Sequence, residues 1–81
     1  KEYYKEKYSL ENLLNNYKLF PEYTTAIKIA NIYFNQKNYN NCIEWAKKAN
    51  NINAQDAKSW LLYAKSLVKL GKRKKAEKIL K

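Results

Sequence analysis

Histidine is absent from this chain, and cysteine, glycine and proline each occur only once. A zinc site needs several Cys or His ligands, so Cys42 alone cannot build one. A cysteine nucleophile needs an adjacent base, usually histidine, and a phosphate-binding loop needs several glycines, whereas Gly71 stands alone. These absences exclude most catalytic chemistry. We therefore expect a protein that is not an enzyme and that uses no cofactor and no metal.

Long apolar runs are also missing. The longest is Trp60–Ala64, far short of the roughly 20 residues that cross a bilayer, so we expect no membrane span in this segment. A single cysteine forms no intrachain disulfide, so cysteine content does not indicate the cellular compartment. We take the cytoplasm as the default. The chain does not begin with Met and stops within a helical pattern. We expect both ends to be cut from a longer protein, in which a leader or anchor has room to lie.

Arginine is nearly absent, although the net charge is +10. Sixteen of the seventeen basic residues are lysine, and Asn, Tyr and Ile are abundant, which is typical of A/T-rich codons. Proteins that grip phosphates or bases usually exploit the bidentate fork of arginine. We therefore interpret the charge, including the basic run at 72–75, as a solvated surface. Nucleic-acid binding through this basic surface stays open as the alternative.

The residues that are present predict one small, all-α domain. Hydrophobic residues make up 46% of the 81 residues, enough for a modest helical core. Apolar residues recur at helical spacing and never alternate for long enough to make a strand. Turn and cap residues then divide the chain into about five helices, which short loops place as antiparallel neighbours. The expected helices are roughly Glu2–Lys18, Glu22–Asn35, one from about Tyr39, one from the Asp56 cap to about Leu70, and one from near Arg73. Gly71 is expected to end the fourth helix in a left-handed conformation.

Two stretches repeat one helical pattern at a spacing of 34 residues. Positions 26, 29, 30, 33, 42 and 46 of the first copy correspond to positions 60, 63, 64, 67, 76 and 80 of the second. A fixed period of this size predicts a stacked helical-repeat architecture. Such architectures bind partners along a surface.

These residues resemble the tetratricopeptide repeat family, a 34-residue helix–turn–helix with the pattern W-x2-L-G-x2-Y, then A-x3-F, then P. The second copy supplies Trp60, Tyr63, Ala64, Leu67, Gly71, Ala76 and Leu80, and the first supplies Ala26, Ile29, Ala30, Tyr33, Cys42, Ala46 and Ala54. The first copy departs from the pattern in having alanine for its Trp, Phe and Pro. The resemblance implies a short right-handed solenoid: residues 1–21 as the second helix of a partial preceding repeat, 22–55 as one repeat, and 56–81 as a second repeat truncated in its second helix.

The resemblance also assigns sides to individual residues. Trp60 occupies a core position, and Cys42 occupies a small-residue core position, where we expect an inert buried thiol. Trp45 matches no core position and faces either a neighbouring repeat or solvent. The tyrosines at positions 3, 4 and 8 are expected to cover exposed core or to touch a second molecule.

In this family the first helix of each repeat lines a concave groove that holds a peptide or helix of a partner. The positions carried over are Thr24, Ile27, Asn31, Phe34, Asn35, Lys58, Leu61, Lys65, Val68 and Lys69. Lysines at 58, 65 and 69 share one helix face with apolar residues among them, which suits an acidic, partly hydrophobic peptide. Clamping of a chaperone tail is not predicted, because Ile27 stands where the first clamp lysine belongs and Leu62 replaces an asparagine.

The predicted function is a non-enzymatic adaptor or scaffold that binds proteins and aids assembly of a multiprotein complex. The stretch Asn38–Leu70 resembles bacterial repeat proteins that accompany pilus, secretion or DNA-uptake (transformation) machines of the envelope. Self-association through exposed end helices is a further expectation.

Overall fold

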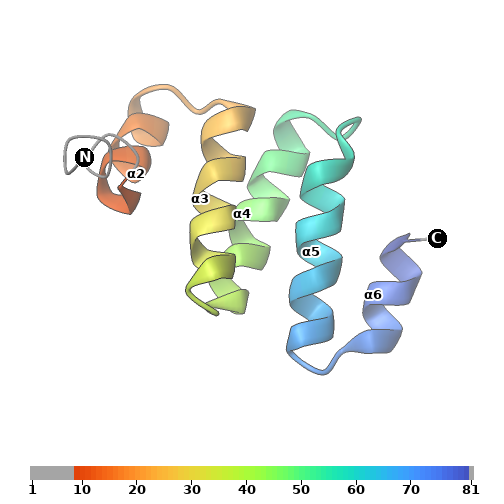
Figure 1. Ribbon diagram of the computed structural model, residues 1–81. Coiled ribbons are helices and arrows are strands. Elements are labelled where there is room, and N and C mark those ends of the chain that lie inside the picture. The colour runs from red at the N-terminus through yellow and green to blue at the C-terminus, as the bar shows by residue number, and fades with distance from the viewer. Residues whose placement is uncertain (1–8, 81) are drawn as a thin grey trace.

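The computed structural model describes residues 9–80, which form five α-helices and no strand (Figure 1). The helices are α2 (Leu10–Leu19), α3 (Tyr23–Asn35), α4 (Tyr39–Ile52), α5 (Ala57–Lys69) and α6 (Arg73–Leu80). Each packs against the next along the chain, and α3 also contacts α5 directly. The predicted all-α fold with short loops between neighbouring helices is confirmed.

The first predicted helix, Glu2–Lys18, is not continuous, because Ser9 has extended backbone and α2 begins at Leu10. The other helix ends lie close to where the sequence predicts them, and local signals set them. Ser9 caps α2 by accepting a hydrogen bond from the backbone N–H of Asn12 at 3.2 Å. Asp56 caps α5 as predicted, because its carboxylate accepts from the backbone N–H of Lys58 at 2.9 Å. The part of the first predicted helix before residue 9, with the tyrosines at positions 3, 4 and 8, lies outside the described residues.

Both interhelical turns of the repeat use one backbone design. At the end of α5, Gly71 has φ +81°, and the N–H of Lys72 bonds to the carbonyl of Leu67 at 2.7 Å. At the end of α3, 34 residues earlier, Lys37 has φ +63°, and the N–H of Asn38 bonds to the carbonyl of Tyr33 at 2.9 Å. This is the Schellman pattern of helix termination, in which one left-handed residue lets the chain reverse. The predicted left-handed role of Gly71 is confirmed.

Small side chains fill the contact between paired helices. The first core cluster contains Ala26, Ile27, Ala30, Cys42, Ala46, Ala49 and Leu62, and the second contains Ala64, Leu67 and Ala76. Cys42 is fully buried, as predicted for a small-residue core position. Alanine and cysteine at these positions let the helix backbones approach closely, and larger neighbours such as Tyr33 and Tyr63 cover the edges.

The prediction that Trp60 belongs to the core is wrong for this structure. Its side chain is 37% exposed, whereas Ala26, its equivalent in the first copy, is completely buried. The indole N–H of Trp60 donates to the carbonyl of Ala54 at 3.2 Å, in the loop that precedes α5. The ring is therefore held beside this loop at the start of α5 rather than inserted fully between paired helices.

Candidate partner-binding surface

The direct contact between α3 and α5 creates one depression of about 150 Å³. Its lining residues are Asn31 from α3 and Lys58, Leu61, Leu62 and Lys65 from α5. Four of these belong to the groove predicted from the sequence, and Leu62 does not. We call the surface formed by these five residues the α3–α5 face.

Helical spacing explains why the α5 residues converge. Positions 58, 61 and 65 are three and four residues apart, so their side chains follow one another along a single stripe of the helix. Leu62 lies beside this stripe, is only 8% exposed and belongs to the first core cluster, so it forms an apolar floor. Leu61 stands at the rim with 47% of its side chain exposed. The depression thus combines apolar surface with two ammonium groups.

The electrostatic character of this surface comes from both of its helices. Neither α3 nor α5 contains an aspartate or glutamate, while α5 carries three lysines and α3 carries one. The nearest carboxylate along the chain is that of Asp56, which caps the start of α5 beside Lys58, while no acidic residue of either helix lies near Lys65. The field near the depression therefore favours anionic groups.

The remaining residues of the predicted groove lie in different environments. Ile27 is only 8% exposed and belongs to the first core cluster, so little of it is available to a ligand. Phe34 is half-buried, with its ring edge-on to Tyr39 at a centroid distance of 5.4 Å. The others are exposed but do not line the depression: Thr24, Asn35, Val68 and Lys69.

A neighbouring hollow of about 240 Å³ extends this surface toward α2. It is lined by Leu13 of α2 and by Lys28, Asn31 and Ile32 of α3. Asn31 lines both hollows, so it stands at their junction. The 34-residue register does not predict this extension, because it places residues 1–21 in the preceding repeat and assigns them no part of the groove.

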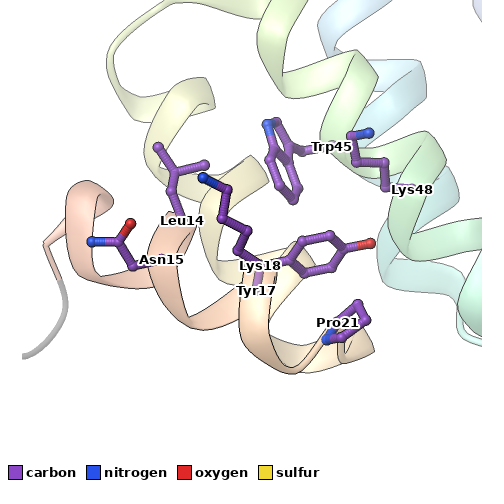
Figure 2. Close-up of a pocket in the computed structure, with 7 residues that line it drawn as sticks. All are labelled: Leu14, Asn15, Tyr17, Lys18, Pro21, Trp45 and Lys48. Atoms are coloured by element: carbon purple, nitrogen blue, oxygen red, sulfur yellow. The ribbon is translucent and has the colours of Figure 1, made fainter.

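A larger hollow of about 490 Å³ lies between α2 and α4 (Figure 2). We call it the α2–α4 pocket; Leu14, Asn15, Tyr17, Lys18, Pro21, Trp45 and Lys48 line it. It shares no residue with the α3–α5 face. The signal in the sequence was Trp45, which matches no core position of the repeat. Its half-buried ring packs against Tyr17 of α2, with the ring centroids 4.8 Å apart.

Two buried groups show shifted pKa values. Burial raises the pKa of the Cys42 thiol above its ordinary value of 9.0, so the thiol stays protonated and unreactive at neutral pH. Burial also raises the pKa of the Tyr23 phenol, and the nearby Asp56 carboxylate adds to this effect. The Tyr23 hydroxyl oxygen is itself buried, and Ser59 as well as Asp56 acts on its pKa. Both groups are neutral at physiological pH and add no charge to either surface.

The described residues contain no cluster of three or more His, Cys, Asp or Glu side chains that is suited to a metal ion. Among the same residues, no helix has the length and apolarity needed to cross a bilayer. The exposed chemistry of the described chain consists largely of lysine ammonium groups, asparagine amides and apolar or aromatic side chains. These groups can form ion pairs, hydrogen bonds and apolar contacts with a bound molecule.

Comparison with known proteins identifies a family. The family model described as anaphase-promoting complex, cyclosome, subunit 3 matches residues 3–81 of the chain. No curated protein and no solved structure matches it significantly. The matching family is built from tetratricopeptide-like repeats, which are generally non-enzymatic and serve protein–protein interaction. The chain therefore belongs to the anaphase-promoting complex, cyclosome, subunit 3 family of helical-repeat proteins.

Proposed function

We propose that the chain captures an acidic, partly apolar peptide or helix of a partner protein on its α3–α5 face. The observation that carries this proposal is the depression in which Lys58 and Lys65 border the apolar side chains of Leu61 and Leu62. Neither α3 nor α5 contains an acidic residue, and the Asp56 carboxylate beside Lys58 is engaged in capping α5. A partner that supplies both carboxylates and an apolar side chain satisfies both parts of the surface.

Each group has a distinct part in the proposed capture. The lysines attract the acidic segment during encounter and set its register, since complementary charge mainly affects association rate and specificity. Leu61 and Leu62 supply apolar contact that excludes water. The carboxamide of Asn31 offers both a donor and an acceptor to a peptide backbone. Because these groups stand on packed helices, their backbone needs no further ordering on binding.

The family supports a role in assembling protein complexes. Its model is named for a subunit of a multiprotein complex, and we infer that this chain likewise holds a partner within an assembly. The association with pilus, secretion or transformation machines stays a prediction. Nucleic-acid binding through the basic surface stays the alternative prediction.

Selection from a phage-displayed library of random peptides tests the proposal even though the partner is unidentified. Wild-type protein should enrich peptides that combine Asp or Glu with Leu, Ile or Phe. The Lys58→Glu/Lys65→Glu variant should lose this enrichment, because the reversed charges repel carboxylates. Titration of one selected peptide, followed by ¹H–¹⁵N NMR, should shift the amide signals of Asn31, Leu61 and Leu62.

A matched control separates the site from the overall charge. The Lys74→Glu/Lys75→Glu variant has the same net charge as the groove variant, but its changes lie on α6, which lines no part of the depression. It should select the same peptides as wild type. Equal loss in both variants would mean that bulk charge alone attracts the peptides, and the groove assignment would be wrong.

A further inference from the structure

We propose that the α2–α4 pocket is a second peptide site, which takes a large apolar side chain flanked by carboxylates from an acidic partner segment. This site stands independently of the α3–α5 face, because it is built from α2, Pro21 and α4 and includes no residue of α3 or α5. Its volume of about 490 Å³ exceeds that of the depression on the α3–α5 face. It is large enough to accept a phenylalanine or leucine side chain together with adjoining backbone.

The aromatic part of the pocket is already held in place. The rings of Tyr17 and Trp45 meet edge to face, with centroids 4.8 Å apart and an interplanar angle of 82°. This geometry is the favourable one for two aromatic rings. Figure 2 shows both rings and Leu14 bordering the hollow, with Pro21 at one end. A ligand therefore meets a fixed apolar wall and does not have to order it, which favours binding.

The charge of the lining identifies the partner's chemistry. Its two ionised side chains are Lys18 from α2 and Lys48 from α4, and the pocket has no acidic lining residue. The ammonium group of Lys48 lies 5.4 Å from the centroid of the Trp45 ring, so the cation borders the aromatic wall directly. Carboxylates on either side of an inserted apolar side chain would find a lysine on each helix. A second copy of this chain fits poorly, because each copy carries a net charge of +10.

Two exposed apolar residues lie in the chain between the pocket residues Lys18 and Pro21. Leu19 and Phe20 are 73% and 62% exposed and directly precede Pro21 in the chain. Large exposed apolar side chains at the edge of a hollow are typical of interaction sites.

NMR titration tests this site directly, because the protein has only two tryptophans and each gives a separate indole N–H signal. The probe is the end-blocked peptide Glu-Asp-Phe-Leu-Asp-Glu. At roughly millimolar peptide, the Trp45 indole signal and the amide signals of Tyr17 and Lys48 should shift in a saturable manner. The Trp60 indole N–H, which is bonded to the Ala54 carbonyl, should stay in place. A peptide with Lys at all four acidic positions should produce no saturable shift.

Charge reversal at the pocket supplies the matched comparison. Lys18→Glu/Lys48→Glu should weaken the Trp45 response about tenfold or more, since both flanking cations become anions. Lys58→Glu/Lys65→Glu, which alters the α3–α5 face by the same net charge, should leave the Trp45 response intact. The circular dichroism spectra of both variants should match that of wild type, and Lys18→Gln/Lys48→Gln serves as a second variant if the reversal disturbs folding.

Three results would overturn the proposal. One is a Trp45 signal that does not move at saturating peptide while Asn31, Leu61 and Leu62 respond, which would leave the α3–α5 face as the peptide site. Another is an equal response to the lysine-substituted peptide. The third is a Trp45 response to single-stranded oligothymidylate at lower concentration than to the peptide, at matched salt, which would make this an aromatic and basic nucleic-acid site.

Discussion

The two helical hairpins, α3–α4 and α5–α6, share one backbone arrangement but differ in the residues that form it. Their residues correspond at a spacing of 34, and both turns close with the same pair of backbone hydrogen bonds. Yet the left-handed turn residue is Lys37 in the first hairpin and Gly71 in the second. The turn geometry is therefore set by the hydrogen-bonding needs of the helix end, and the residue that occupies it determines only the energetic cost.

The hairpins also differ in how their contacts are filled. In the first, the cluster around Cys42 is joined by Leu62 from α5 and covered by Tyr17 from α2 and Trp45. In the second, the described cluster around Ala76 is covered by Ile43, Tyr63 and Ile79. The first hairpin thus gains burial from helices on both of its sides. We expect substitutions of buried residues in this hairpin to cost more stability than substitutions of its exposed residues.

The largest expected effect is the loss of a fully buried side chain from the first hairpin. Ile29 has no exposed surface, so Ile29→Ala should lower the free energy of unfolding by about 2–5 kcal/mol through lost burial and a cavity. Urea unfolding followed by circular dichroism measures the change. The control Ile52→Ala removes a side chain that is 44% exposed and should cost clearly less. Equal costs for the two substitutions would contradict the assignment of Ile29 to a tightly packed interior.

The next largest change in stability is expected from substitutions at the two left-handed turn residues. Gly71→Ala should destabilise by about 1 kcal/mol, because a side chain at φ +81° is strained. A Cβ at this position meets no atom within 4 Å, so the loss reports backbone conformation alone. Lys37→Gly should act in the opposite direction and stabilise by roughly 0.5–1 kcal/mol. Chemical denaturation of both variants measures the change in the free energy of unfolding. Changes of the same sign in the two variants would contradict the equivalence of the two turns.

A pH effect should distinguish the equivalent core positions Cys42 and Ala76. Burial raises the pKa of Cys42 in the folded protein above its ordinary value of 9.0. The unfolded chain therefore releases the thiol proton first, and stability that is fully present below pH 9.0 is lost as the pH rises from there through the folded pKa.

The variant Cys42→Ala, which copies the second hairpin, should lose this part of the alkaline decline. The quantity to compare is the fall in the free energy of unfolding between about pH 8 and pH 10 in the two proteins. The raised pKa of Tyr23 leaves a further decline, which begins near its ordinary value of 10.0 and is common to both proteins. Identical declines in both proteins would show that the Cys42 thiol titrates alike in the folded and unfolded states.

The smallest expected effect lies at the start of the second helix of each hairpin. Asn38 caps α4 by accepting from the N–H of Asn41 at 3.5 Å, whereas Lys72 precedes α6 at the equivalent position. Lys72→Asn should stabilise by about 0.5 kcal/mol, because an amide caps and a cation is repelled by the positive end of the helix. Thermal unfolding measures the gain, and Asn38→Lys should produce a comparable loss. A neutral result for both would mean that capping plays no part in the difference between the hairpins.

The fold followed from the sequence to a large extent because its determinants are local. The predicted cap at Asp56 and the predicted turn at Gly71 depend on hydrogen bonds spanning only a few residues. The buried alanines and Cys42 followed from the 34-residue register, which fixes the face of each helix that meets its partner. The same register predicted part of the proposed site, since Lys58, Leu61 and Lys65 lie on one stripe of α5.

Only the tertiary structure determined which stripes of different helices meet. It buried Ile27 in the core although its register position faces the groove, and it left Trp60 partly exposed beside the Ala54 loop. It also brought Tyr17 and Trp45, 28 residues apart in the chain, into ring contact and opened a pocket between α2 and α4. Apart from the start of α2, the sequence by itself determined where the helices begin and end and which faces are apolar, because those properties depend on neighbours within one or two turns. The surfaces available to partners depend on the distances and angles between helices, which arise only when all of the side chains pack together.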